Sequence, residues 1–207
     1  MNIAFFDFDG TVTTGDGFLP FIRVAVPQYR IVASTLCLAP LISGHYLGWV
    51  PACRMRESIA WFAFRGRPIA EVIEHGRRYA ERVLPGRVRP RARQQLEWHQ
   101  AQGDRVVVVS ASLDAYLVPW CRAQGFELIC SELEARGGIC TGGYIGGDCS
   151  GPEKARRILA RYDLAQYPQV FAYGDTEEDR EMLGLASRRY LRWQELAPSG
   201  SFSHPAT

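Results

Sequence analysis

The stretch IAFFDFDGTVTT, residues 3–14, places two aspartates at the end of an apolar run near the start of the chain. Its first part, residues 3–8, is apolar or aromatic apart from Asp7, which is typical of a strand buried in a parallel sheet. Because an unpaired buried carboxylate is costly, we expect the strand to end here. Side chains two residues apart on a strand share a face, so Asp7 and Asp9 should lie side by side. Gly10 then lets the chain turn away.

Two later apolar runs also have the composition of central strands and also end in polar residues. They are RVVVVSAS, residues 105–112, and QVFAYGD, residues 169–175. Strands alternating with helices predict an α/β fold, a doubly wound, Rossmann-like parallel sheet. The intervening elements are a helix over 113–124, a strand over 126–132, a glycine-rich hairpin over 137–151 and a helix over 152–162. Ligands bind beyond the carboxyl ends of such strands, where we expect Asp7, Asp9, Ser110 and Asp175 to meet.

The long segment between the first two strands has the periodicity of helices. Apolar residues recur at three- and four-residue spacing in 56–64, 69–84 and 89–103. A crossover between parallel strands needs only about a dozen residues. We therefore predict a helical cap over residues 14–84, inserted into an α/β core formed by residues 1–13 and 85–196. The Pro-, Ser- and Gly-rich residues 197–207 are predicted to be a disordered tail.

Within the insertion, residues 29–50 (YRIVASTLCLAPLISGHYLGWV) carry no charge after Arg30. Length alone would allow a transmembrane span. Pro40, Gly44 and Gly48 interrupt the segment and favour two shorter buried helices. A hairpin lying in the membrane interface is the third alternative.

Composition indicates a soluble globular protein, with 47% hydrophobic and 22% charged residues in 207. Residues 10–100 hold 13 arginines against 6 acidic residues, which either form a solvated face or attract an anionic substrate or an anionic membrane. No basic stripe interleaved with aromatics appears, so nucleic acid is not an expected partner. The start of the chain is not a secretory signal, and the six scattered cysteines are expected to be reduced thiols of a cytoplasmic protein.

The paired aspartates predict a metal site. Two carboxylates this close repel each other unless a cation lies between them, and Mg²⁺ prefers such oxygen ligands. One aspartate could then act as a nucleophile and the other as a general acid and base. In YGDTEEDREML, Asp175 follows a strand and is the expected third metal carboxylate. Asp179 is either a further ligand, a supporting residue or a helix cap.

Ser110 and Lys154 are candidates for phosphate binding. The Ser110 hydroxyl and the backbone N–H groups that follow it suit a phosphate oxygen, although Ser110 or Ser112 could instead cap the next helix. Lys154 is the only lysine among 24 basic residues, which hints at a need for a compact ammonium group. The seven glycines of residues 137–151 lack the spacing of a nucleotide-binding loop and indicate turns.

Taken together these motifs resemble the haloacid dehalogenase superfamily of phosphohydrolases. The matching segments are DFDGT, VVVVSAS, GPEKARRI and GDTEED, in that order, and the insertion resembles the phosphoserine-phosphatase-like branch. The resemblance implies that Asp7 forms an aspartyl-phosphate, while Asp9 protonates the leaving oxygen and then activates water. It implies Mg²⁺ held by Asp7, the Asp9 backbone carbonyl and Asp175. The phosphoryl group would be bound by Ser110, Ala111, Lys154, Gly10 and Thr11.

The resemblance leaves several substrates open. Phosphoserine phosphatases place a glutamate where this chain has Asp16, and a cap arginine for which Arg54 and Arg56 are the nearby candidates. Their serine–glycine–glycine is SAS here, with Ser112 at the last position. We therefore expect a small soluble phosphomonoester. The alternatives are phosphoserine, a phosphotransferase reaction, or a lipid phosphate such as phosphatidylglycerol phosphate, with residues 29–50 in peripheral contact with the inner face of the membrane.

Overall fold

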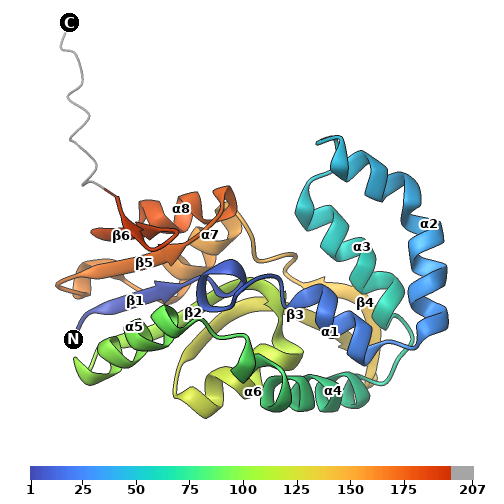
Figure 1. Ribbon diagram of the computed structural model, residues 1–207, viewed down its shortest axis with the longest axis horizontal. Helices are drawn as coiled ribbons and strands as arrows, with labels where there is room; N and C mark the ends of the chain where they lie inside the picture. Colours follow the sequence, from blue (N-terminus) through green and yellow to red (C-terminus); the bar gives the residue numbers. More distant parts are fainter. Residues whose placement is uncertain (197–207) are drawn as a thin grey trace, which may run out of the picture.

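The structure, a computed structural model, describes residues 1–196 and contains a seven-stranded sheet in the order β4-β3-β2-β1-β5-β6-β7 (Figure 1). The predicted tail, residues 197–207, lies outside the described residues. The strands are β1 (Ile3–Phe6), β2 (Arg105–Leu113), β3 (Glu127–Arg136), β4 (Ile139–Ile145), β5 (Val170–Gly174), β6 (Arg188–Leu191) and β7 (Gln194–Glu195).

The strand that opens the sequence lies at the centre of the sheet. Phe6, the last residue of β1, pairs in parallel with Val108 of β2 and with Tyr173 of β5. These three strands therefore end at the same edge, which is what the predicted doubly wound sheet requires. The pairs β3–β4 and β6–β7 are antiparallel. The predicted hairpin is therefore present, but it is formed by β3 and β4, and the glycine-rich segment supplies only its turn and its second strand.

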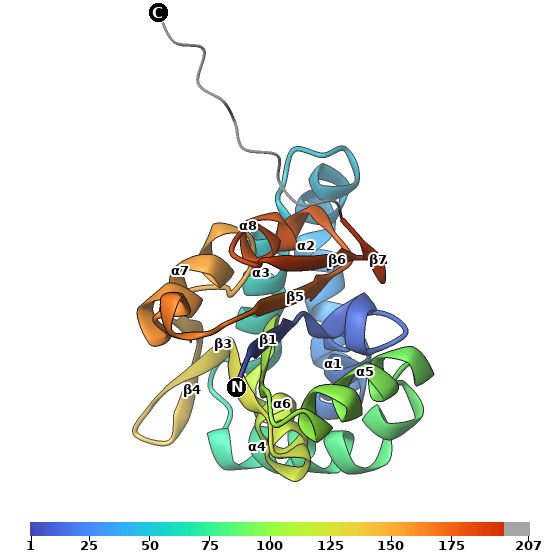
Figure 2. The same cartoon turned by 90° about the vertical axis from the view of Figure 1, so that its left-hand side faces the viewer.

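Helices cover both faces of the sheet (Figure 2). Because side chains alternate along β1, Ala4 and Phe6 face one apolar core and Ile3 and Phe5 the other. The first core includes residues of α5 (Pro90–Ala101) and α6 (Asp114–Gln124) and of helices inserted after β1, and the second includes residues of α7 (Pro152–Arg161) and α8 (Arg180–Gly184). Short helical turns occur at η1 (Phe8–Val12), η2 (Leu84–Gly86), η3 (Leu164–Gln166) and η4 (Glu177–Asp179).

The segment between β1 and α5 is helical, as predicted. It contains α1 (Phe18–Ala25), α2 (Gln28–Tyr46), α3 (Ala52–Phe64) and α4 (Ile69–Arg82). Helices α1 to α3 lie beyond the ends of the central strands (Figure 1). Thr13 and Val88 form an antiparallel bridge, so the insertion leaves and rejoins the core at adjacent points. The cap boundaries at residues 14 and 84 stay a prediction.

The prediction of two shorter buried helices within residues 29–50 is wrong. A single 19-residue helix, α2, runs through Pro40, and Leu38 and Gly44 are its buried residues. Proline removes one backbone hydrogen bond, and here the carbonyl that loses its donor belongs to Leu36, a residue that is 72% exposed. The absence of charged residues after Arg30 in this segment therefore did not indicate a buried helix. None of the helices within residues 1–196 has the length and apolar character needed to cross a membrane.

Candidate active site

The ends of the central strands meet in a cavity of about 350 Å³. The structure thus brings together most of the residues predicted from the sequence, from both the core and the cap. The lining residues are Asp7, Asp9, Gly10, Gly15, Asp16, Phe18, Arg56, Ser110, Ala111, Ser112, Lys154, Asp175, Thr176 and Glu178. Of the predicted site residues, Thr11, Asp179 and Arg54 do not line it. Thr11 and Asp179 lie directly behind it, whereas Arg54 is an exposed cap residue.

Lys154 links two of the carboxylates. It lies in the first turn of α7 with its side chain 2% exposed. Its Nζ atom donates to Oδ1 of Asp7 and to Oδ1 of Asp179, both at 2.6 Å. Burial alone would lower the pKa of this ammonium, but the two carboxylates outweigh burial and raise it. Lys154 is therefore held as a cation beneath the cavity.

Asp7 lies immediately after β1, and its N–H donates to the Tyr173 carbonyl at 2.9 Å. Burial raises the pKa of Asp7 to about 8; Lys154 opposes this shift, and the charges of Asp179 and Asp9 add to it. Burial, together with Asp179, also raises the pKa of Asp175. If Asp7, Asp175 and Asp179 were all ionised, they would carry more negative charge than the single ammonium of Lys154 can offset, so a further cation is needed to keep them ionised.

Asp179 shapes the loop that follows β5. Its Oδ2 atom accepts hydrogen bonds from the N–H groups of Asp175 at 3.0 Å and Thr176 at 3.1 Å, while Oδ1 accepts from Lys154. Both of its oxygens are therefore engaged within the protein. Asp175 faces Gly10, where a Cβ atom would lie only 2.1 Å from Oδ2 of Asp175 and where φ is +82°. Glycine at this position lets the two loops approach.

A divalent cation fits this cluster. Asp7, Asp175 and Asp179 each offer a carboxylate oxygen within 4.8 Å of the others. Three carboxylates around one ammonium leave an excess of negative charge, and hard cations such as Mg²⁺ take oxygen ligands of this kind. Because both oxygens of Asp179 are engaged, Asp7 and Asp175 are the better ligands and Asp179 the better support. That the Asp9 backbone carbonyl also binds the ion stays a prediction.

The Asp9 side chain is held by donors from the core and the cap. Its Oδ1 atom accepts from the Gly17 N–H at 2.7 Å, and Oδ2 accepts a very short hydrogen bond from the Ser112 hydroxyl. Burial raises the pKa of Asp9 to about 6, and the hydrogen bonds from Ser112 and Gly17 oppose the rise. A carboxyl group with a pKa in this range suits proton transfer near neutral pH.

Ser110 lies within β2 and is buried at the cavity. Its Oγ atom accepts from the Ser112 N–H at 3.0 Å. The next helix begins only at Asp114, after Leu113, so neither serine caps it and that alternative is wrong. Sequence reasoning missed the contact of Ser112 with Asp9. The signal was present, since Ser112 comes two positions after Ser110 and residues two positions apart on a strand share a face.

The predicted cap residues differ in what they contact. Asp16 accepts from the N–H groups of Phe18 at 2.9 Å and Leu19 at 3.1 Å, which caps the start of α1. Arg56 of α3 binds Asp148 through two hydrogen bonds of 2.8 and 2.9 Å and Glu178 at 3.2 Å. These two acidic partners come from the core and were not foreseen.

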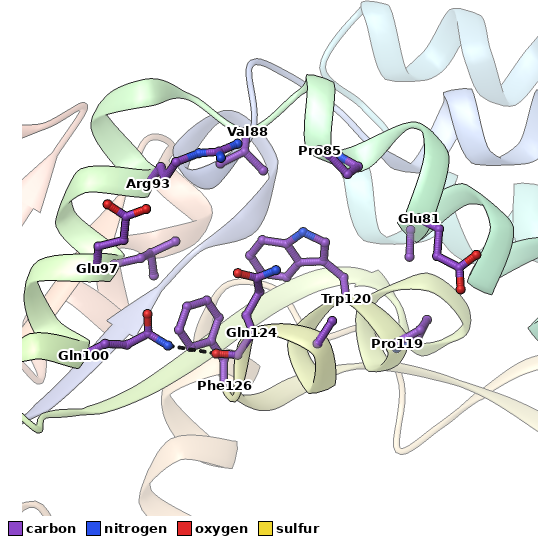
Figure 3. A pocket seen from close by; sticks show the side chains of 13 residues that line it. Glu81, Pro85, Val88, Arg93, Glu97, Gln100, Pro119, Trp120, Gln124 and Phe126 are labelled. Carbon is purple, nitrogen blue, oxygen red and sulfur yellow. Dashed lines mark hydrogen bonds between the residues drawn. The ribbon is translucent and has the colours of Figure 1, made fainter.

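A second cavity, of about 330 Å³, lies between α5 and α6 (Figure 3). Trp120 and Phe126 form its apolar wall, and Gln100 donates to the Gln124 carbonyl at 2.8 Å beside it. It shares no lining residue with the first cavity. Its Glu81, Arg93 and Glu97 come from helix surfaces and form no cluster with the strand-end carboxylates.

Comparisons with known proteins agree with the motifs. The sequence matches the haloacid dehalogenase-like hydrolase family over residues 4–184. It is 30% identical over 199 residues to Protein CicA of Caulobacter vibrioides, covering 90% of this chain and 84% of the relative. It is also 28% identical over 202 residues to a histidinol-phosphatase of Neisseria meningitidis, covering 90% and 87%.

Solved structures share the fold. A Bordetella pertussis protein of unknown function has a TM-score of 0.70 at 19% identity, covering 91% of this chain and 88% of its own. A substrate-bound phosphoserine phosphatase has a TM-score of 0.65 at 15% identity, with coverage of 92% and 85%. The family match spans nearly all of β1, the strands β2 to β5, the helical insertion and the loops that carry the clustered carboxylates. The chain therefore belongs to the haloacid dehalogenase-like hydrolases and is an enzyme of the phosphatase type.

Proposed function

We propose that this protein is a Mg²⁺-dependent phosphomonoester hydrolase that works through an aspartyl-phosphate on Asp7. The observation that carries the proposal is the placement of Asp7, whose Oδ1 atom lies 2.6 Å from Nζ of Lys154 at the floor of the cavity. Lys154 fixes one oxygen of Asp7, and we assign the other as the nucleophile. Ser110 and Ala111 line the same cavity, and a serine hydroxyl and a backbone N–H group suit the phosphoryl oxygens.

In the first step, an Asp7 oxygen attacks phosphorus, and the bond from phosphorus to the leaving oxygen breaks. Asp9 gives its proton to that oxygen, so the product leaves as an alcohol. In the second step, water attacks phosphorus, Asp9 takes a proton from the water, and the bond from Asp7 to phosphorus breaks. Inorganic phosphate leaves, and Asp7 is regenerated. Lys154 stabilises charge on the phosphoryl group in both steps.

Asp7 and Asp175 would hold the Mg²⁺ ion, with Asp179 supporting the Asp175 loop. When bound, the ion supplies positive charge that neutralises the phosphoryl oxygens and the crowded carboxylates. Thr11 keeps Asp175 oriented, since its hydroxyl donates to Oδ1 of Asp175 at 3.5 Å. In this proposal each residue of the strand ends has a separate task.

The test is phosphate release from p-nitrophenyl phosphate with and without Mg²⁺. Asp7→Asn should abolish turnover, because an amide is a poor nucleophile at phosphorus. Asp163→Asn is the matched control, since Asp163 is an exposed residue that caps η3. Turnover by Asp7→Asn at the wild-type rate, or full turnover after Mg²⁺ removal, would contradict the proposal.

For the substrate, we propose a small soluble phosphomonoester that carries an amine and no carboxylate. Lys154 and Arg56 are the cationic side chains that line the cavity among residues 1–196, and Arg56 already binds Asp148 and Glu178. A substrate carboxylate would find no unpaired cation there, and the acidic residues that line the cavity, including Asp16 and Glu178, make its charge more favourable to an amine than to a carboxylate. This disfavours phosphoserine and agrees with the likeness to a histidinol-phosphatase.

The substrate proposal is tested by comparing kcat/KM for histidinol phosphate, phosphoethanolamine and phosphoserine. We expect both amines without a carboxylate to be preferred over phosphoserine by at least about tenfold, the effect of roughly 1.4 kcal/mol. A preference for phosphoserine would contradict it. Addition of an acceptor alcohol to the same assay detects phosphoryl transfer in place of hydrolysis.

A lipid phosphate is the second candidate, favoured by one specific observation. Tyr29, Val32 and Leu36 share one face of α2, and all are more than half exposed. Tyr46, the last residue of α2, and Trp49, in the turn between α2 and α3, are 85% and 79% exposed. An apolar groove of about 400 Å³ also lies between α1, α2 and α3. Such a surface could rest on the inner face of a membrane.

This candidate predicts that Leu36→Ser with Trp49→Ser weakens binding to anionic phospholipid vesicles. The same pair should lower turnover of phosphatidylglycerol phosphate and leave p-nitrophenyl phosphate turnover unchanged. Ile73→Ser is the control, since Ile73 is half exposed on α4. If vesicle binding is absent from the wild type, the soluble substrate stands alone and the enzyme is expected in the cytoplasm without membrane contact.

A further inference from the structure

We propose that Ser112, oriented by Tyr116, positions the Asp9 carboxyl group for proton transfer to and from the substrate. This inference rests on the function proposed above and adds two positioning residues to it. Ser112 is where phosphoserine phosphatases usually carry glycine, so the arrangement is not expected from that resemblance. The evidence for it is a chain of hydrogen bonds that runs from Tyr116 through Ser112 to Asp9.

The chain of hydroxyl groups has a defined direction. The Tyr116 hydroxyl donates to Oγ of Ser112 at 2.6 Å, and Ser112 donates to Oδ2 of Asp9. A serine hydroxyl has one hydrogen, so with the Tyr116 hydrogen bond already accepted, that hydrogen is directed to Asp9. Both residues are buried, at 2% exposure for Ser112 and 0% for Tyr116. Hydrogen bonds in such surroundings hold their geometry firmly.

Tyr116 is itself fixed by aromatic packing. Its ring lies 4.9 Å from that of Phe21 on α1 and 5.3 Å from that of Tyr79 on α4, between ring centroids. These contacts leave the hydroxyl pointing at Ser112. Ser112 is therefore oriented by Tyr116 of α6, whose ring is in turn held by Phe21 and Tyr79 of the helical cap.

The other oxygen of Asp9 is fixed through Gly17. The Gly17 N–H donates to Oδ1 of Asp9 at 2.7 Å, and the Tyr79 hydroxyl donates to the Gly17 carbonyl at 3.1 Å. A Cβ atom at residue 17 would lie 3.0 Å from Oδ1 of Asp9 and 3.4 Å from the Tyr116 hydroxyl. Asp9 is thus held at both oxygens, and removing the Ser112 hydroxyl would free one side of it.

A misplaced Asp9 should affect substrates unequally. An alkyl leaving oxygen is strongly basic and needs a proton as its bond breaks, whereas p-nitrophenolate leaves readily without one. Because kcat/KM reports the steps up to phosphoryl transfer, it reveals this difference even where a later step limits kcat. A role in packing alone would lower kcat/KM by the same factor for both.

The experiment measures kcat/KM for a series of aryl and alkyl phosphates with wild type, Ser112→Ala, Ser112→Thr and Tyr116→Phe. We expect Ser112→Ala to lose about tenfold or more on alkyl phosphates and less than about threefold on p-nitrophenyl phosphate, from the size of general-acid effects. Ser112→Thr, which keeps the hydroxyl, should restore part of the loss. Tyr116→Phe should show the same pattern more weakly.

Two controls separate positioning from folding. Tyr162→Phe removes a buried hydroxyl that donates to Glu127 at 2.8 Å in the other core, and it should change neither substrate class. In an Asp9→Asn background, Ser112→Ala should add no further loss. An equal loss on all substrates, or an additive loss in that background, overturns the inference alone. Absence of any wild-type turnover overturns the proposed function and this inference with it.

Discussion

The ammonium of Lys154 lies 2.6 Å from Oδ1 of Asp7 and approaches it from beneath the cavity. The same atom lies 2.6 Å from Asp179, so a single cation joins the end of β1 to the loop after β5 through the start of α7. Removing one member of a buried ion pair leaves the other charge uncompensated, which costs more than the pair contributes. Lys154 is therefore important to both stability and chemistry.

We predict that Lys154→Met lowers the free energy of unfolding by about 3 kcal/mol and abolishes phosphatase turnover. Lys154→Arg should also be inactive, because a guanidinium group is too wide for this buried position. Urea unfolding and phosphate release measure the two effects. Arg156→Met is the control on the same helix, since its ion pair with Glu153 is exposed. If Lys154→Arg keeps wild-type activity, a compact ammonium is not required.

The close approach of Gly10 and Asp175 yields a second prediction. In Gly10→Ala the new Cβ would lie 2.1 Å from Oδ2 of Asp175 and would also face a positive φ. We expect loss of more than about 100-fold in kcat/KM, because small displacements of reacting groups are that costly. Gly66→Ala is the matched control, with φ of +76° and nothing within 4 Å. Similar activity losses in both variants would show that backbone strain, not the clash with Asp175, is responsible.

Much of the site could be predicted because it lies where strands end. Buried parallel strands can be recognised in the sequence as apolar runs. Asp7, Asp9 and Asp175 come at the ends of two of these runs. Lys154 could be identified because it is the only lysine in the sequence. These residues needed no tertiary information beyond the rule that parallel strands end at one edge.

Contacts between the cap and the core were not predictable in this way. Asp148 and Glu178 are distant from Arg56 in the sequence, and no local pattern indicates that they meet it. In the sequence, Pro40 favours a break, but helix α2 continues through it, because an exposed helix can continue through a proline when the lost hydrogen bond faces solvent. Such features depend on tertiary packing.

Arg56 joins the cap to the core and differs sharply from its neighbour Arg54. The side chain of Arg56 is 18% exposed and that of Asp148 only 3%, whereas Arg54 is 73% exposed and lies 3.9 Å from Glu57. We predict that Arg56→Ala lowers the free energy of unfolding by about 3 kcal/mol, since Asp148 is left buried without a cation. Arg54→Ala should change it by less than about 0.5 kcal/mol. Equal effects in thermal or urea unfolding would contradict this account.

Asp114 provides a prediction about pH and stability away from the metal cluster. Burial raises the pKa of Asp114 to about 6, against its ordinary 3.8, although the N–H groups of Leu133 and Ala115 oppose the shift. Between these two values the folded protein keeps a proton that the unfolded chain has lost. Its contribution to the free energy of unfolding therefore falls as pH rises from about 4 to about 6, and is constant above.

Asp114→Asn should remove this contribution, because the amide does not ionise and its oxygen can still accept both hydrogen bonds. Relative to wild type, the variant should gain about 2 kcal/mol between pH 4 and pH 7. Subtracting the two urea-unfolding curves cancels the other carboxyl groups with raised pKa values, including Asp9 and Asp175. Asp163→Asn, at an exposed site, controls for the general loss of a negative charge. A difference between Asp114→Asn and wild type that stays constant across this pH range would show that Asp114 is already ionised in the folded protein.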